Sequence, residues 1–404
     1  MSFRFELLHR DAGTGARTGR MHTAHGTVET PVFMPVGTQA TVKAVGQDDL
    51  QTLGAEIILG NTYHLMLRPG EALVQRLGGL HRFMAWPRAI ITDSGGYQVY
   101  SLAQSRRITE EGATFQSHLD GSQHVLTPER AVAIQEALGA DILMALDECP
   151  PSRSERAYLE ESLARTTRWL RRCARAWKGG SGALFGIAQG GLDLGLRRRH
   201  LEEVCAIDLP GYALGGYSVG ERPEEMQASV AEVAPLMPED RPRYLMGVGT
   251  PVDLMQAVAA GIDMFDCVLP TRCARNGLLF THQGRLNLRN AVHARDESPP
   301  DARCDCYTCR THSRAYLRHL FAADELLALR LATLHNLHHY LSLMRGAREA
   351  IAEDRFAAFV ADVREREGGR APPLGDEPGA DPPPARGRAG GQPGRTGTRG
   401  KRRE

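Results

Sequence analysis

The sequence has no apolar run of about 18 residues or more, although hydrophobic types make up 42% of its 404 residues. A helix needs about 20 apolar residues to cross a bilayer, so we expect no membrane span. The apolar stretch within residues 1–11 is too short and too broken for a secretion signal. Eight cysteines are present, and three of them within six residues fit a clustered metal site better than a disulfide framework. We therefore expect a cytoplasmic protein without membrane contacts.

The chain also has few lysines and almost no net charge. Only three lysines occur, 46 of the 49 basic residues are arginine, and the formal net charge is +1. Residues 371–404 hold seven basic and four acidic side chains, which leaves 42 and 44 for the first 370 residues. Any nucleic-acid contact of the folded part must therefore come from a local patch. Because 371–404 is mostly proline, glycine and arginine, we expect residues 1–370 to fold and 371–404 to form a disordered tail.

Eight short apolar runs organise the body of the chain, and each ends in glycine or a polar residue before a helix-like stretch. The runs are Val32–Thr38, Glu56–Thr62, Ala89–Gly95, Asp141–Glu148, Leu184–Gly191, Tyr212–Ser218, Tyr244–Thr250 and Asp263–Val268. Such runs between helices are typical of buried parallel strands. Helices are expected at Pro128–Leu138 behind the N-cap Thr127, at Glu155–Ala176 and at Pro223–Ala234. The alternation favours a (β/α)8 TIM barrel over a doubly wound sheet, since no G-x-G-x-x-G follows a first strand.

Two stretches interrupt this alternation. Ile108–Leu126 is interpreted as a hairpin with Asp120-Gly121 as its turn. Residues 276 to about 345 are interpreted as a metal-binding insertion near the C-terminus of the barrel. This insertion ends in a long helix from Asp324 to about Arg345, and a last helix is expected at Ala347–Arg366.

The cysteine cluster lies in this insertion. Cys304, Cys306 and Cys309 offer three thiolates, one ligand short of a tetrahedral zinc site. Spacing alone does not choose the fourth ligand among four histidines, which are His312, His335, His338 and His339. Three thiolates and one imidazole leave no open coordination position, so the predicted zinc is structural.

The carboxyl ends of barrel strands are where an active site is expected. The ends of the eight runs supply three carboxylates, two amides and several glycines, namely Asn61, Asp93, Asp147, Gln189, Gly215, Gly216, Gly247 and Asp266. Two separated aspartates suit displacement at the anomeric carbon of a sugar, where one attacks and the other handles protons. Asp147 and Gln189 suit recognition of the edge of a base, and Tyr97 and Met246 suit stacking on a flat ring.

Two arginines follow the last of these strand ends. Arg272 and Arg275 lie directly after Asp266 in L-P-T-R-C-A-R-N-G. Beside a site suited to a nucleoside, they are candidates for contacts to phosphate.

Five motifs occur in a set order along the chain. They are T-D-S-G-G-Y-Q (Thr92–Gln98), G-I-A-Q-G-G (Gly186–Gly191), Y-L-M-G-V-G (Tyr244–Gly249), D-M-F-D-C-V-L-P-T-R (Asp263–Arg272) and C-x-C-x2-C with a later histidine. Together they resemble the queuine tRNA-ribosyltransferases, the tRNA-guanine transglycosylases, over about Phe3 to Arg366. The resemblance implies a zinc-bearing (β/α)8 barrel that forms a homodimer.

The resemblance also implies an activity. Members of the family exchange the wobble guanine of GUN-anticodon tRNAs (for aspartate, asparagine, histidine and tyrosine) for a 7-deazaguanine base, through a covalent enzyme–RNA intermediate. The sequence D-E-C-P (Asp147–Pro150) resembles bacterial members, which insert 7-aminomethyl-7-deazaguanine (prequeuine) in queuosine biosynthesis. The expected enzyme class is therefore a pentosyltransferase.

Roles for single residues follow from the same resemblance. Asp266 matches the nucleophile and Asp93 the general acid/base. The substrate-binding positions are Asp93, Ser94, Gly95, Gly96, Tyr97, Asp147, Gln189, Gly216 and Met246. The RNA-binding positions are Gly247, Val248, Gly249, Thr250, Pro251, Val252, Asp253, Thr271, Arg272, Cys273, Ala274 and Arg275. The ligands of one structural Zn2+ per subunit are Cys304, Cys306, Cys309 and His335.

One residue departs from the family pattern, and two other classes of function compete. Tyr217 stands where the family usually has leucine, at a position whose backbone carbonyl contacts the base. The competing classes are a non-catalytic tRNA-binding subunit of the same family and a barrel glycosidase. The presence of both Asp93 and Asp266 argues against the first. The zinc subdomain, together with Arg272 and Arg275, argues against the second.

Overall fold

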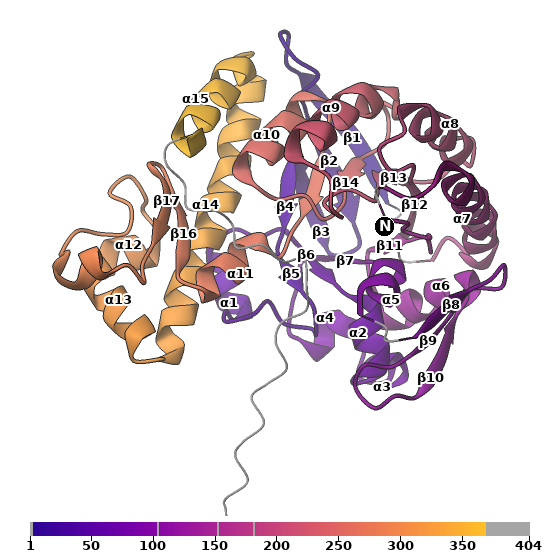
Figure 1. Cartoon of the computed structure of the whole chain (residues 1–404), viewed down its shortest axis with the longest axis horizontal. Coiled ribbons are helices and arrows are strands. Elements are labelled where there is room, and N and C mark those ends of the chain that lie inside the picture. The colour runs from indigo at the N-terminus through magenta and orange to yellow at the C-terminus, as the bar shows by residue number, and fades with distance from the viewer. Residues whose placement is uncertain (1–2, 103–104, 152, 181, 369–404) are drawn as a thin grey trace, which may run out of the picture.

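The computed structural model describes residues 3–102, 105–151, 153–180 and 182–368 (Figure 1). Its central sheet has nine parallel strands, in the order β4-β15-β14-β13-β12-β11-β7-β6-β5. Their bounds are β4 (Val32–Met34), β5 (Val36–Gly37), β6 (Ile57–Gly60), β7 (Ala89–Thr92), β11 (Ile142–Met144), β12 (Ala183–Ala188), β13 (Gly211–Leu214), β14 (Arg243–Leu245) and β15 (Met264–Asp266). Strands β4 and β5 come from one apolar run interrupted at Pro35. Because β4 pairs with β15 and β5 pairs with β6, the sheet closes on itself, which confirms the (β/α)8 barrel.

Helices cover the outside of the barrel. They are α1 (Gln47–Thr52), α2 (Thr62–Leu67), α3 (Glu71–Arg76), α4 (Gly79–Phe83), α5 (Gly96–Leu102), α6 (Pro128–Leu138), α7 (Arg156–Ala176), α8 (Leu194–Cys205), α9 (Pro223–Val233), the short 3-10 helix η1 (Ala234–Leu236) and α10 (Pro251–Ala259). The three predicted helices are confirmed as α6, α7 and α9. The N–H of Arg130 donates to the Thr127 hydroxyl, 3.2 Å away, as an N-cap requires. No helix of the described ranges is long and apolar enough to cross a membrane.

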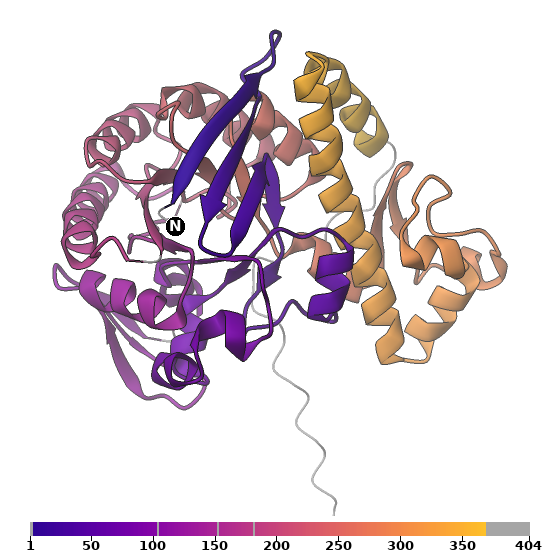
Figure 2. The same cartoon turned by 180° about the vertical axis from the view of Figure 1, so that it is seen from behind.

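A three-stranded antiparallel sheet closes the amino end of the barrel. It consists of β1 (Arg4–Arg10), β2 (Arg17–Thr23) and β3 (Gly26–Thr30), drawn in indigo in Figure 2. Met21 and Val28 of this sheet belong to the same buried cluster as the barrel interior, and the Phe3 ring meets Phe185 edge-on at 5.6 Å. This sheet was not predicted, because β2 reads R-T-G-R-M-H-T and contains a single large apolar residue.

The stretch interpreted as a hairpin, Ile108–Leu126, belongs to a small three-stranded sheet. It consists of β8 (Arg106–Ile108), β9 (Ala113–Gln116) and β10 (Gln123–Leu126) in the order β10-β9-β8. The turn between β9 and β10 is also wider than Asp120-Gly121, since the N–H of Ser117 donates to the carbonyl of Ser122 at 2.8 Å. The strand β8 escaped prediction because it is short and begins with two exposed arginines.

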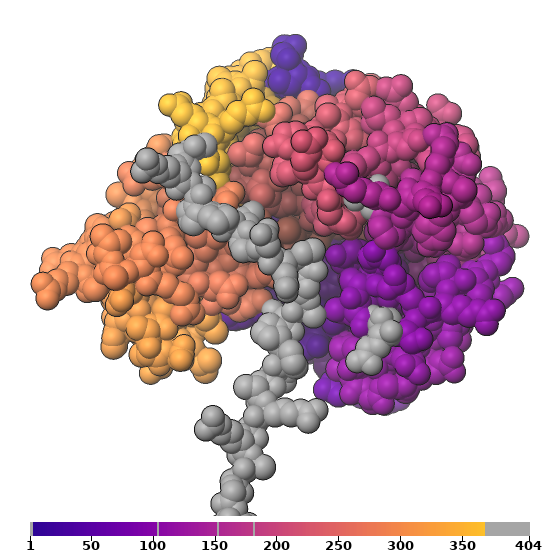
Figure 3. All heavy atoms as spheres, in the orientation of Figure 1, coloured from indigo at the N-terminus to yellow at the C-terminus, as the bar shows by residue number. Residues whose placement is uncertain are grey.

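A subdomain follows the last barrel strand and forms the orange and yellow part at one side of the barrel in Figure 3. Its elements are α11 (Leu269–Arg275), β16 (Leu278–Thr281), β17 (Gly284–Asn287), the short 3-10 helix η2 (Ala291–Arg295), α12 (Tyr307–Thr311), α13 (Arg314–Ala322), α14 (Leu326–Ala352) and α15 (Phe356–Gly368). Helix α14 also packs on the barrel, where the Tyr340 and Phe33 ring centroids lie 4.9 Å apart.

The predicted boundary between the last two helices was wrong. Helix α14 continues through Gly346, and a Cβ at that position would lie 3.0 Å from the Phe359 ring of α15. The glycine therefore allows two helices to approach and does not end one. The chain turns at Asp354 instead, where φ is +51°. The predicted tail, residues 371–404, lies outside the described residues.

Candidate active site and metal centre

The predicted carboxylates meet at the carboxyl ends of the barrel strands. Asp93 and Gln189 directly follow β7 and β12, Asp147 follows β11, and Asp266 is the last residue of β15. Asp93, Asp147 and Gln189 are buried. Strands β7, β11 and β12 are neighbours in the sheet, and β15 lies three strand positions beyond β12, so Asp266 approaches the mouth of the barrel from another side. Its charge acts on Asp93.

Asp93 is held by the segment that follows the neighbouring strand β6. One carboxylate oxygen accepts the side-chain amide of Asn61 at 2.5 Å, and the other accepts the N–H of Thr62 at 2.8 Å. Burial raises the pKa of Asp93 from 3.8 to about 6; the bonds from Asn61 and Thr62 lower it, and the charge of Asp266 raises it further. A carboxyl with a pKa near neutrality suits transfer of protons in both directions.

Asp266 is held by groups of the neighbouring strand β14 and its loop. Its Oδ1 accepts the hydroxyl of Tyr244 at 2.5 Å and the N–H of Gly247 at 2.9 Å. Burial raises the pKa of Asp266, and these two bonds lower it. Two donors on one oxygen fix the orientation of the carboxylate.

Asp147 and Gln189 form a linked polar pair. The Asp147 oxygens accept the hydroxyl of Ser94 at 3.0 Å and the amide Nε2 of Gln189 at 2.7 Å. The Oε1 atom of Gln189 is buried and has no hydrogen-bond partner in the described part of the chain. Burial raises the pKa of Asp147, and the bonds from Gln189 and Ser94 lower it. The pair thus presents acceptors and an amide side by side, as recognition of a base edge requires.

The other predicted substrate-binding residues surround this pair. Gly95 and Gly96 connect β7 to α5, and the N–H of Gly96 donates to the Ser94 hydroxyl at 3.1 Å. The side chain of Tyr97 is 41% exposed, whereas Met246 packs against the barrel interior. Their roles as stacking walls stay a prediction.

The predicted RNA-binding segments lie at the ends of the neighbouring strands β14 and β15. The first, Gly247–Asp253, leads into α10, whose N-cap Thr250 accepts the N–H of Asp253 at 3.2 Å. The second, Thr271–Arg275, lies within α11.

Three cations gather beside these segments. Burial lowers the pKa of Lys43, and the charges of Arg275 and Arg272 lower it further. Burial raises the pKa of Tyr97, and the charge of Arg272 acts to lower it. The structure therefore adds one of the few lysines to the predicted arginine pair at the rim of the mouth.

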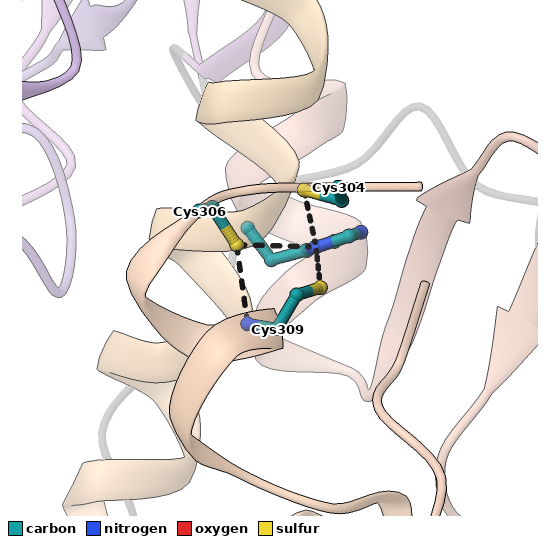
Figure 4. Close-up of side chains that lie close together, drawn as sticks. Cys304, Cys306 and Cys309 are labelled. Carbon is teal, nitrogen blue, oxygen red and sulfur yellow. Dashed lines mark hydrogen bonds between the residues drawn. The ribbon is translucent and has the colours of Figure 1, made fainter. Parts of the chain in front are cut away.

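The cysteine cluster converges on one histidine. The Nδ1 atom of His335 lies 3.8 Å from the sulfur of Cys304, 3.6 Å from that of Cys306 and 3.2 Å from that of Cys309 (Figure 4). Its Nε2 donates to the carbonyl of Phe280 at 2.8 Å, which turns Nδ1 toward the thiolates. These four side chains are compatible with a metal ion in a closed site.

The three other candidate histidines are placed differently. The Nδ1 of His338 lies 3.5 Å from the sulfur of Cys304. His339 groups with His282 and Asp301 instead, and the His312 ring stacks on Tyr316 at 5.2 Å. Geometry thus favours His335 as the fourth ligand.

Three residues near the site were not assigned a role from the sequence. Tyr244 counted as part of an apolar run, although its hydroxyl bonds the Asp266 carboxylate. Lys43 entered only the count of lysines, and no prediction was made for Arg197, which is buried. A polar group inside an apolar run was the only available signal, and it applied to Tyr244 alone.

Comparison with known proteins matches this architecture. The family model described as "Queuine tRNA-ribosyltransferase" matches residues 11–368. Proteins with that name from Nitratidesulfovibrio vulgaris and Solidesulfovibrio magneticus are 60% and 59% identical, over 88% and 86% of this chain and 95% and 94% of their own lengths. A protein of the same name from Halothermothrix orenii is 55% identical over 89% of this chain and 96% of its own length. The chain therefore belongs to the queuine tRNA-ribosyltransferase family.

Proposed function

We propose that this protein is a tRNA-guanine transglycosylase that replaces the wobble guanine of GUN-anticodon tRNAs with 7-aminomethyl-7-deazaguanine. The observation that carries the proposal is the pair Asp93 and Asp266, each held by two hydrogen bonds at one barrel mouth. A non-catalytic subunit needs neither carboxylate in this arrangement. The basic group formed by Lys43, Arg272 and Arg275 favours an RNA over a neutral sugar polymer.

The first half-reaction forms a bond between enzyme and RNA. The ionised carboxylate of Asp266 attacks C1′ of the ribose, and the bond from C1′ to N9 of guanine breaks as the new C1′–O bond forms. Neutral Asp93 gives its proton to N9 of the departing guanine. Splitting one difficult displacement into two easier steps is what a carboxylate nucleophile contributes.

The second half-reaction restores the enzyme. Ionised Asp93 takes the N9 proton of the incoming base, N9 attacks C1′, and the bond to Asp266 breaks. The proton on Asp93 and the charge on Asp266 are then as they were at the start. A pKa of about 6 supports both roles of Asp93, because both of its forms are accessible near neutral pH.

Recognition of the base falls to the linked pair and its neighbours. The Asp147 carboxylate accepts from the N–H groups of a guanine-like edge, and Gln189 with the backbone N–H of Gly216 donates to its carbonyl oxygen. Ser94, Gly95 and Gly96 complete this side of the pocket, while Tyr97 and Met246 stack on the ring.

Contact with tRNA falls to the basic rim. Residues 247–253 and 271–275 bind the anticodon loop, with Arg272 and Arg275 on phosphates. The choice of GUN anticodons and of prequeuine follows the family resemblance, and a tRNA substrate implies a cytoplasmic location.

A structural zinc ion fits the cluster of Cys304, Cys306, Cys309 and His335. Soft thiolates and one imidazole are the donors that zinc prefers in closed sites. The ion would take no part in the reaction. It would lie between β16, α12 and α14 and stabilise the fold of the subdomain. Residues 1–370 would then act as one barrel unit with a zinc subdomain, and 371–404 as a dispensable tail.

We further propose a homodimer formed through the zinc subdomain. Its helices expose large apolar side chains, which are Tyr307, Tyr316, Leu326 and Leu327. Burial of these side chains against a second copy of the chain would stabilise a dimer. Light scattering with the mutation Leu326→Asp compared with wild type tests this assignment, and a wild-type monomer would refute it.

The deciding experiment is exchange of labelled guanine into tRNA. The wild type should incorporate label, and Asp266→Asn should not. Tight tRNA binding without incorporation would assign the protein to the non-catalytic class, and release of sugar from oligosaccharides would assign it to the glycosidases.

A further inference from the structure

A buried arginine without a role in the reaction lies behind the base-recognition residues. The side chain of Arg197, on α8, is 1% exposed. Within the described ranges, no carboxylate lies within ion-pair distance of its guanidinium. Burial of a guanidinium without a carboxylate partner is energetically costly, so hydrogen bonds and other contacts must replace the lost hydration.

Those contacts join the loops that follow β12 and β13. The Nε of Arg197 donates to the carbonyl of Gly191 at 2.8 Å, and its terminal nitrogens donate to the carbonyls of Gly215 at 3.0 Å and Gly216 at 3.4 Å. Gly190 leaves room for this side chain, because a Cβ there would lie 2.5 Å from Cγ of Arg197. One guanidinium thus links the carbonyls of two active-site loops.

The face of the same guanidinium rests on Tyr217. Its central carbon lies 3.7 Å from the centroid of the ring, and the Tyr217 hydroxyl meets that of Ser229 on α9 at 2.8 Å. A cation over an aromatic face is strongly attracted when both are shielded from water.

The linked loops in turn confine the base-recognition amide. A Cβ at Gly216 would lie 2.2 Å from Oε1 of Gln189, and one at Gly215 would lie 2.6 Å from its Nε2. The amide of Gln189 therefore rests directly on this backbone while it donates to Asp147. Any displacement of the backbone at 215–216 would move that amide.

We propose that Arg197 and Tyr217 form a clamp that positions Gln189 and Gly216 for binding of the free base. The proposal rests on the transglycosylase function proposed above. Both are positioning residues, since neither takes part in the displacement at C1′. The clamp bonds neither the catalytic aspartates nor the basic rim, so its loss should affect affinity for the base more than affinity for tRNA.

The test is a kinetic series with guanine as the probe. The variants Arg197→Lys and Tyr217→Ala each remove one half of the clamp, and Tyr217→Phe keeps the aromatic face. We expect the KM for guanine to rise about tenfold or more in the first two, because a displacement on the order of 1 Å can cost about 100-fold. The KM for tRNA should stay within about twofold, and Tyr217→Phe should retain a KM near that of the wild type.

The matched control is Arg198→Ala on the same helix. Arg198 is exposed and pairs with Glu232 at 2.5 Å, so its loss removes a charge without touching the clamp. An unchanged KM for guanine in Arg197→Lys, or equal rises in both KM values, would overturn the clamp. If Arg197→Lys does not fold, Tyr217→Ala against Tyr217→Phe decides by the same criterion. A wild type without any exchange would instead refute the proposed function.

Discussion

Replacement of Asp93 by asparagine should stabilise the fold at neutral pH while it removes the proton transfer. The folded protein raises the pKa of this carboxyl from 3.8 to about 6, chiefly by burial. A raised pKa means that the native state binds the proton more tightly than the unfolded chain. The stability that this group contributes is therefore fully present below pH 3.8 and is lost as pH rises through about 6.

The size of the effect follows from the shift. About two pKa units correspond to roughly 3 kcal/mol, which the ionised carboxylate costs the fold above pH 6. Asparagine avoids this cost and keeps both hydrogen bonds: its oxygen accepts the N–H of Thr62, and its amide meets Asn61 once that side chain rotates by half a turn. For a chain of this length, roughly 3 kcal/mol corresponds to about 4 °C in Tm.

Calorimetry between about pH 4 and pH 8 measures this difference. The Tm of Asp93→Asn should exceed that of the wild type at pH 8, and the gap should close toward pH 4. Asp208→Asn is the control, because it removes a carboxylate that is 91% exposed. A gap of the same size at every pH, or no gap at pH 8, would refute the assignment of the raised pKa to Asp93.

Four further outcomes are expected. Asp266→Asn should abolish exchange and leave tRNA binding largely intact, since an amide is a poor nucleophile; a tRNA adduct of this variant on a denaturing gel would exclude Asp266 as the nucleophile. Cys306→Ala should lose zinc and thermal stability together, because metal binding and local folding are coupled; full stability of metal-free protein would contradict a structural zinc. Arg275→Ala should lower the salt slope of tRNA binding by about one, and an unchanged slope would place Arg275 outside the RNA interface. Truncation after Gly369 should leave turnover unchanged at physiological salt and weaken tRNA binding slightly at low salt, where a basic tail is least screened; a large loss of turnover would show that the tail is needed.

The barrel could be predicted from the sequence because its strands are buried on both faces. Runs such as Ala89–Gly95 begin with consecutive apolar residues and change abruptly to polar ones, so they stand out from the amphipathic helices between them. The sheet β1–β3 could not be found in this way. One face of this sheet packs on the barrel, through residues such as Met21 and Val28. Each of these apolar residues stands among polar neighbours in the sequence, so no apolar run marks the strands.

The candidate site was predictable in part for the same geometric reason. Side chains directly after a buried parallel strand reach the mouth of a barrel, and this rule located Asp93, Asp147, Gln189 and Asp266. The rule also located Asn61, a partner of Asp93, but it did not locate every residue that supports the site. Thr62, the first residue of α2, donates its backbone N–H to Asp93, and Arg197 extends from α8 to the loop carbonyls. Only the folded chain shows these contacts.

The surroundings of the two aspartates also distinguish their roles. Asp266 receives a phenolic hydroxyl and a backbone N–H on one oxygen, and both favour its ionised form. Asp93 receives donors as well, but the charge of Asp266 acts against its ionisation. Burial raises the pKa of both carboxyls, and these contacts favour the arrangement that the proposed mechanism requires, with the proton on Asp93 and the charge on Asp266. The opposite assignment would leave the Tyr244 hydroxyl and the Gly247 N–H donating to a neutral carboxyl, which accepts hydrogen bonds less strongly than a carboxylate.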